Sequence, residues 1–247
     1  MRRSWYIVTA AVLIAAFLVS LSAVLYEFRR ASDTMYYLFI DLTFLPLQVL
    51  IVTLILNRLL EVRERNELGQ RVNIVISVFF NEMGIDLLRY LSQFDVSLDE
   101  MRAIAGVNEG WTSRNFATMR KRLVSYDYSI DCHCADIEDL RGLLRAKHEA
   151  AFAIISNPSL LEQESFTELM WAILHLEREL QYRPNLDDLS DADYAHLGSD
   201  MRRVYVLLVV EWLSFAERLK QSQPYSFSLA VRLNPLAQNP SANVDYQ

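Results

Sequence analysis

The sequence predicts an all-α protein in which a two-helix transmembrane hairpin precedes a cytoplasmic helical bundle. Two long apolar stretches occur within the first 60 residues, and apolar residues recur at helical spacing afterwards. The 247 residues include only six Gly and six Pro, which is more typical of helices than of sheets. We expect the hairpin over residues 1–60, the bundle over 61–223 and a C-terminal tail over 224–247. The tail is expected to be extended, because apolar and polar residues alternate over 225–233.

The two apolar stretches are each long enough to cross a bilayer. Residues 5–26 contain no charged side chain, and residues 35–56 contain a single one, Asp41. At about 1.5 Å of rise per residue, each stretch covers the roughly 30 Å of a hydrocarbon core. For the first stretch, a signal peptide cleaved near Ser20-Leu21-Ser22 is the alternative, and it leaves the second span unchanged.

The charges near the two spans predict their orientation. The connecting segment 27–34 carries two basic and two acidic residues. Basic residues concentrate on the other side of the spans, at Arg2, Arg3, Arg58, Arg63, Arg65 and Arg71. This bias predicts a multi-pass protein of the prokaryotic inner (cell) membrane with both termini in the cytoplasm. The chain after residue 60 has nine more acidic than basic side chains, which argues against nucleic acid as a partner.

Spacing and capping residues predict the helices beyond the membrane. The chain from Asn57 to Glu67 lacks Pro and Gly and alternates in charge, so the second span should continue as a helix. That helix either joins the domain core directly or forms a signalling or oligomerisation stalk. Ser97, Ser165 and Ser190 each precede an acidic residue by three positions and are expected helix N-caps. The bundle helices are predicted near 71–93, 98–105, 113–125, 136–155, 166–182 and 191–221.

Several segments resemble a family of uncharacterised prokaryotic membrane proteins with two transmembrane helices and a helical cytoplasmic domain. The resemblance rests on residues 41–48 (DLTFLPLQ), 157–162 (NPSLLE), 165–176 (SFTELMWAILHL) and 224–235 (PYSFSLAVRLNP). It covers most of the chain. In the family a Thr-Asn-Pro-Phe follows the Arg of the tail, whereas Leu233-Asn234-Pro235-Leu236 follows Arg232 here. The family has no known activity, so the resemblance implies the architecture and transfers no catalytic residue.

Three polar or helix-breaking residues mark the second span. Asp41 is an ionisable group in an apolar stretch, which is costly unless it faces a partner, a water path or the headgroup level. Gln48 lies seven residues on, on nearly the same helix face, and Pro46 between them frees a backbone carbonyl. Together they indicate helix–helix contact between subunits or a polar pathway, while placement of Asp41 at the headgroups stays open.

The bundle contains a few polar residues that need a partner. Glu211 interrupts the most apolar stretch after residue 60, which is too short to span a membrane and is expected to be a buried helix. Its carboxylate therefore needs a partner or a raised pKa. His175 and Glu179 share one helix face, and Asp193 precedes His196 by three. Dimetal bundles need more carboxylates than this, so a hydrogen-bonded His–carboxylate contact between helices is expected.

Cys132, His133 and Cys134 form a weak candidate metal site. Thiolate and imidazole suit zinc, but structural zinc sites use two such pairs at wider spacing. The two cysteines are also too close for an unstrained disulfide. We expect a reduced loop here, no bound metal and no cofactor.

These observations do not identify a reaction, and we expect a role other than catalysis. The leading hypothesis is a membrane protein that acts as a binding, sensor or scaffold protein through its cytoplasmic domain. Its expected partners are the lipid bilayer and either further copies of itself or another membrane protein. The alternative is a small homo-oligomeric channel or transporter lined by the second span. A third hypothesis is a membrane-tethered metalloenzyme using His175 or Cys132 and Cys134.

Overall fold

The computed structural model describes residues 2–27, 33–186 and 188–243. Among these residues the chain is helical, and the only strand-like feature is an isolated antiparallel bridge between Asp95 and Ile130. The all-α prediction is therefore confirmed. The chain divides into two compact units, Met1–Leu68 and Gly69–Gln247.

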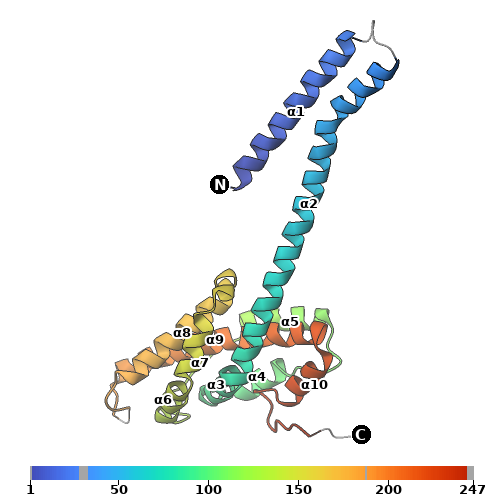
Figure 1. Ribbon diagram of the computed structural model, residues 1–247. Coiled ribbons are helices and arrows are strands. Elements are labelled where there is room, and N and C mark those ends of the chain that lie inside the picture. The colour runs from blue at the N-terminus through green and yellow to red at the C-terminus, as the bar shows by residue number, and fades with distance from the viewer. Residues whose placement is uncertain (1, 28–32, 187, 244–247) are drawn as a thin grey trace. The chain divides into compact units, whose positions relative to one another are not determined.

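Unit 1 contains α1 (Arg2–Glu27), which is dark blue in Figure 1, and most of α2 (Asp33–Phe79), whose colour runs from blue to teal. The rings of Phe17 and Phe44 contact each other with centroids 6.0 Å apart. Apolar side chains along α2 are exposed around the helix, as at Val52 (54%) and Leu54 (57%). A helix that exposes apolar groups in this way is typical of a lipid environment.

The described residues support the two predicted spans to different extents. Among the described residues, one helix is long and apolar enough, within the continuous helical run Ile40–Phe94. In α1 (Arg2–Glu27), the apolar stretch found among the described residues is Ala11–Ala23. The predicted two-helix transmembrane hairpin is therefore supported only for its second helix.

The charged stretch after the apolar part of α2 is helical, as predicted. Arg58 and Arg65 both reach Glu61, at 2.9 Å and 3.0 Å, and Arg63 contacts Glu67 at 2.8 Å. These pairs stand three or four residues apart on the exposed surface and contribute only a few tenths of a kcal/mol each, about 0.2–0.5. They favour the helix over other local structures, and α2 continues without a break to Phe79.

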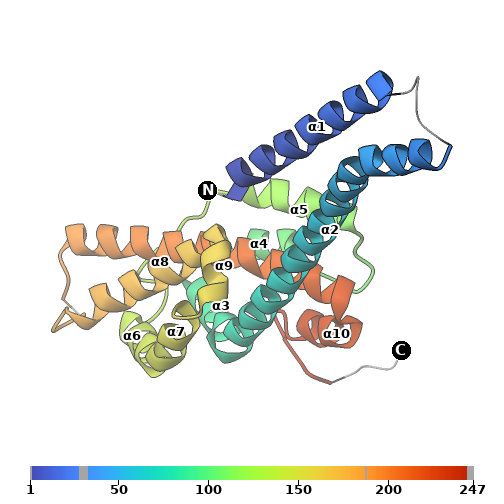
Figure 2. The same cartoon turned by 45° about the horizontal axis from the view of Figure 1, so that its top comes forward.

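Unit 2 is a helical domain built around α9, which lies centrally in Figures 1 and 2. Helices α3, α5, α8 and α10 all contact α9. The predicted helix positions agree with the structure to within a few residues, except that 71–93 and 136–155 are each divided. The elements are η1 (Phe80–Gly84), α3 (Ile85–Leu91), η2 (Ser92–Phe94), α4 (Leu98–Ile104), α5 (Ser113–Ser125), α6 (Ile137–Ala146), α7 (His148–Ile155), η3 (Pro158–Glu162), α8 (Glu164–Gln181), α9 (Asp191–Ser222) and α10 (Pro224–Arg232).

Aromatic rings fill the core of unit 2 where α2 ends in a π-helical turn, η1. Phe80 stacks on Phe215 with centroids 4.7 Å apart, and Phe79 meets Phe166 edge-on at 5.0 Å. Gly84 closes this turn against the rings. A Cβ at Gly84 would lie 2.6 Å from Phe79 Cε1 and 2.7 Å from Phe80 Cδ1, so the packing requires glycine.

A buried carboxylate ties distant segments of unit 2 together. Asp95 accepts hydrogen bonds from the Tyr126 hydroxyl at 3.0 Å, the Tyr205 hydroxyl at 3.1 Å and the Ser97 backbone N–H at 3.0 Å. Tyr128 is also buried, and its ring lies edge-on to those of Tyr126 and Tyr205. Burial, reinforced by the charge of Asp95, raises the pKa of all three tyrosines well above their usual value.

Three local predictions were wrong. The tail predicted to be extended begins with a helix, α10, which starts at Pro224 and buries Phe227 and Ala230. These residues are three apart, so the same apolar residues also fit a helical period. Ser165 does not cap α8, because the helix begins at Glu164 and the Ser165 hydroxyl bonds elsewhere. Ser97 stands at the N-cap position of α4, but its side chain makes no capping hydrogen bond.

Candidate functional site

The most concentrated group of ligand-type side chains lies between α8 and α9. Nε2 of His175 and Nε2 of His196 each lie 3.5 Å from Oδ2 of Asp200. That oxygen is buried and accepts no hydrogen bond from the described residues. Both imidazoles are about half exposed, with side-chain values of 52% and 53%. The site is therefore accessible to solvent on the histidine side and closed behind Asp200.

The antiparallel packing of α8 and α9 assembles this group. Each helix contributes two residues four positions apart, His175 and Glu179 on α8 and His196 and Asp200 on α9. Residues four apart share one helix face, so an antiparallel pair brings His175 opposite Asp200 and Glu179 opposite His196. His175 thus lies near a carboxylate across a helix interface, that of Asp200. It differs from the expected contact, because the imidazole is about half exposed and forms no hydrogen bond with this oxygen. Asp200 was not predicted, although its four-residue spacing from His196 is a usable signal.

Glu179 is held by an arginine beside this group. Its Oε2 lies 2.7 Å from Nη1 of Arg183 and 3.6 Å from Nε2 of His196. The hydrogen bond from Arg183 lowers the pKa of Glu179, and burial opposes this only in part. Arg183 also approaches Asp193, at 3.4 Å. Glu179 is thus an ionised carboxylate already engaged by a guanidinium.

A cleft of about 420 Å³ adjoins His175 between α7 and α8. Trp171 and Phe152 line it and are 62% and 60% exposed, and Tyr182 is 79% exposed. Aromatic side chains this large are usually buried, so their exposure around one hollow indicates a binding surface. The remaining lining residues are His148, Ile155, Leu174, His175, Glu177, Arg178 and Gln181.

Two polar groups that line this aromatic cleft are already paired with each other. Nδ1 of His148 lies 2.8 Å from Oε1 and 3.0 Å from Oε2 of Glu177. Glu177 is only 8% exposed, so its carboxylate depends on this partner. Arg178 lines the same cleft and is exposed. The cleft therefore combines an apolar wall with an accessible cation.

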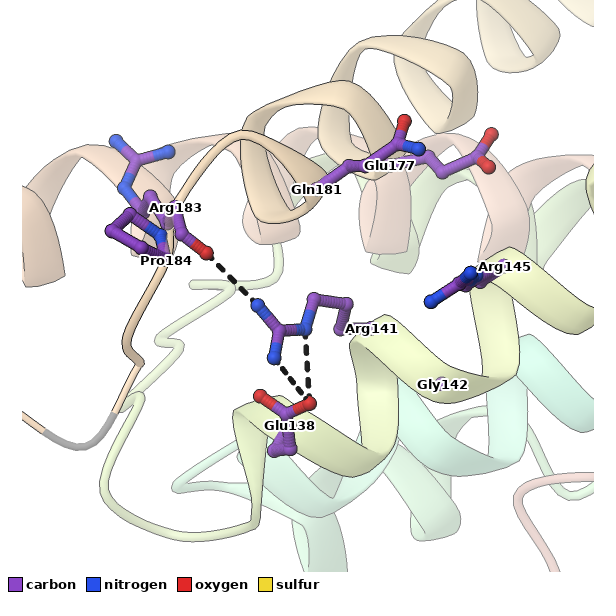
Figure 3. Close-up of a pocket in the computed structure, with 8 residues that line it drawn as sticks. All are labelled: Glu138, Arg141, Gly142, Arg145, Glu177, Gln181, Arg183 and Pro184. Carbon is purple, nitrogen blue, oxygen red and sulfur yellow. Dashed lines mark hydrogen bonds and ion pairs between the residues drawn. The ribbon is translucent and has the colours of Figure 1, made fainter.

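Glu177 and Gln181 also line a second hollow of about 300 Å³, shown in Figure 3. Arg141 of α6 lies between the Glu138 carboxylate and the backbone carbonyl of Arg183, which accepts a hydrogen bond from Nη1 at 2.9 Å. The Arg183 guanidinium points away from this contact. Arg141 thus connects α6 to the end of α8, and its donors are engaged in structural contacts.

The Cys132, His133 and Cys134 segment does not form a comparable group among the described residues. Both cysteines are free thiols, and Cys132 is buried whereas Cys134 is exposed. The Cys132 thiol lies 3.5 Å from the Tyr194 carbonyl, and burial raises its pKa to about 11. At neutral pH Cys132 is therefore a protonated core residue, as expected for a reduced loop.

Glu211 is buried, as predicted, and its carboxylate interacts with Ser165 and Arg218. Its Oε1 accepts a hydrogen bond of 2.6 Å from the Ser165 hydroxyl, and its Oε2 lies 3.9 Å from Nη2 of Arg218. Burial lowers the pKa of Arg218, and the Glu211 charge counteracts this. Of the two predicted solutions, a partner is therefore present. This buried group links α8 to α9 and does not open onto either hollow.

The three residues singled out in the second span lie on α2. Asp41 and Gln48 are exposed, and Pro46 is partly buried within the helix without ending it. Within the described part of unit 1, Thr43 between them is the buried residue, at 2% exposure. Their predicted role in subunit contact or a polar pathway remains a prediction.

Over the described residues, these features define an all-α protein with one membrane-length apolar helix and a C-terminal helical domain. Two family models match the chain: "MJ1433, N-terminal helical domain" over residues 1–60, and "Uncharacterized protein MJ1433, C-terminal helical domain" over residues 68–232. The chain belongs to this MJ1433 family. It is 36% identical over 228 residues to "Uncharacterized protein MJ1433" of Methanocaldococcus jannaschii, covering 90% of this chain and 92% of that protein. No solved structure matches it.

Proposed function

We propose that this protein is a membrane-anchored binding protein whose C-terminal domain takes up a small amphipathic acid in the aromatic cleft. The observation that carries the proposal is the exposure of Trp171 and Phe152 around a hollow of about 420 Å³. This volume falls within the range of about 300–1,000 Å³ typical of small-molecule pockets. Such sites combine apolar walls with a few polar groups that orient the ligand.

The lining of the cleft supports an acidic ligand with an apolar body. Trp171, Phe152 and Leu174 offer apolar surface, whereas the carboxylate of Glu177 is already engaged by His148. Arg178 is the exposed cation in the lining, and a guanidinium pairs well with a carboxylate or sulfonate. Uptake of such a ligand is the kind of event that a sensor or regulatory protein uses.

The apolar part of α2 supports anchorage in a prokaryotic cell membrane. The arginines flanking the apolar stretches support cytoplasmic termini, and Asp41 and Gln48 support contact between copies in the membrane. Cys134 is an exposed thiol suited to testing the orientation. A membrane-impermeant maleimide should label Cys134 in permeabilised cells and not in intact ones. Labelling in intact cells would contradict a cytoplasmic domain.

Ligand binding is tested with 2-naphthalenesulfonate, which has an apolar ring system and one anionic group. The full chain in lipid nanodiscs is titrated by calorimetry, with empty nanodiscs as the blank. We expect Trp171→Ala and Arg178→Gln each to weaken binding about tenfold, equivalent to about 1.4 kcal/mol. Tyr225→Ala is the matched control, because Tyr225 is a 94% exposed aromatic residue outside the cleft. Equal losses in Trp171→Ala and Tyr225→Ala, or no binding at all, would refute the proposal.

A further inference from the structure

The group formed by His175, His196 and Asp200 has the composition and geometry of a metal site. One ligand atom from each residue lies within 4.8 Å of the others. Imidazole nitrogen and carboxylate oxygen are both ligands of divalent transition metals. The chain has four histidines, and two of them converge on one carboxylate oxygen.

The separations can be compared with those around a bound ion. With metal–ligand bonds of about 2.0–2.1 Å, the ligand atoms of a tetrahedral site lie about 3.3 Å apart. Both Nε2–Oδ2 separations here are 3.5 Å. The third pair consists of the two histidine nitrogens, which lie at most 4.8 Å apart. A shift of about 1.5 Å would bring a pair at that distance to tetrahedral spacing. Rotation of two half-exposed imidazole rings can supply a change of this size.

The buried oxygen of Asp200 is the second observation. Oδ2 is enclosed and accepts no hydrogen bond from the described residues, whereas most buried polar atoms have a partner. Separations of 3.5 Å are longer than normal N–H···O hydrogen bonds, so the imidazoles do not satisfy this oxygen well. A cation between the two nitrogens and Oδ2 would satisfy all three atoms.

We propose that His175, His196 and Asp200 bind a divalent first-row transition-metal ion, with Zn²⁺ as the reference case. Two histidines and one carboxylate leave further coordination positions facing solvent, because both imidazoles are about half exposed. Glu179 stays with Arg183 at 2.7 Å and acts as an outer carboxylate near His196. The carboxylates of Asp200 and Glu179 are accompanied by one arginine, Arg183, so the excess negative charge favours binding of a cation.

Metal binding is tested by Zn²⁺ competition with a chromogenic chelator, using the metal-stripped full chain in detergent. We expect one Zn²⁺ per chain. Loss of an outer-sphere partner typically weakens metal binding by about 10–100-fold, so His196→Gln and Asp200→Asn, which remove ligands, should weaken it by at least about 100-fold. His133→Gln is the matched control, because it replaces a histidine outside this group, and it should change affinity less than threefold.

Three further comparisons make the result decisive. Cys134→Ser removes the exposed thiol and should leave the affinity unchanged, because we assign no ligand there. Zn²⁺ should raise the thermal unfolding temperature of the wild type and not that of Asp200→Asn, which reports binding independently of chelator competition. Trp171→Ala tests the cleft and should still bind Zn²⁺, so failure of one proposal does not imply failure of the other. Absence of Zn²⁺ binding, or full binding by His196→Gln and Asp200→Asn, would overturn the metal assignment.

Discussion

Raising the pH above 10 should unfold the C-terminal unit, because three buried tyrosines near Asp95 stay protonated when folded and ionise once the unit unfolds. Tyr126, Tyr128 and Tyr205 are 8%, 5% and 0% exposed, and the pKa of each is raised by burial and by the Asp95 carboxylate. A raised pKa means that the folded state retains protons that the unfolded state releases. The stabilisation is therefore fully present below pH 10 and is lost as the pH rises further.

The size of this loss follows from proton linkage. Each tyrosine that stays protonated only when folded lowers the free energy of unfolding by about 1.4 kcal/mol per pH unit above 10. Three such groups give a slope of up to about 4 kcal/mol per pH unit. A domain with a typical stability of about 5–15 kcal/mol would then unfold within a few pH units.

The assay is guanidinium unfolding of the full chain in detergent between pH 8 and 11.5, followed by tryptophan fluorescence, to which the buried Trp111 and Trp212 of unit 2 contribute. Tyr205→Phe should lower the stability at pH 8, because a hydrogen bond to Asp95 is lost, and should reduce the alkaline slope by about one third. Tyr225→Phe, at an exposed position, should change neither. Absorbance at 295 nm provides the decisive result. If all tyrosines ionise near pH 10 in the folded protein, the reasoning about Asp95 is wrong.

Three further predictions concern other parts of the chain. Gly84→Ala should destabilise unit 2 by about 1–3 kcal/mol, because the added Cβ overpacks against the phenylalanine rings. Gly142→Ala should stabilise it by about 0.5–1 kcal/mol, because the added Cβ would meet open space in a helix. Thermal unfolding measures both variants, and equal effects would contradict the packing argument. Iodoacetamide at pH 7.5 should alkylate Cys134 within minutes and Cys132 only on unfolding, as measured by mass spectrometry; fast labelling of both would show that Cys132 is not buried. Asp41→Asn should shift the protein from oligomer to monomer in mild detergent, as measured by light scattering, and an unchanged mass would exclude Asp41 from the subunit contact.

The helices of unit 2 could be predicted because local signals and tertiary packing agree there. Ser190 caps α9 through the Asp193 N–H, as its spacing predicts. Ser165 has the same local pattern, but its hydroxyl bonds the buried Glu211 carboxylate instead. A buried charge without a donor costs more than a missing N-cap, so the long-range contact prevails.

The candidate sites could be predicted only in part. The spacing of His175 and Glu179 along one helix was visible, but the register of α8 against α9 decides that Asp200 lies opposite His175. The aromatic cleft was not predicted, because Trp171 and Phe152 are residue types usually found in cores, and only the fold reveals their exposure. Single-helix periodicity contains no information about which faces of two helices meet.

The π-helical turn at η1 also determines the rotational phase of the chain before it. Such a turn holds one residue more than an α-turn, and one residue corresponds to about 100° of rotation about the helix axis. Removing a residue there would rotate Ile76 and Phe79 away from the core that they now fill. Chain length between Ile76 and Leu87 is therefore constrained as well as the identity of Gly84, and tolerated insertions or deletions should be confined to exposed loops elsewhere.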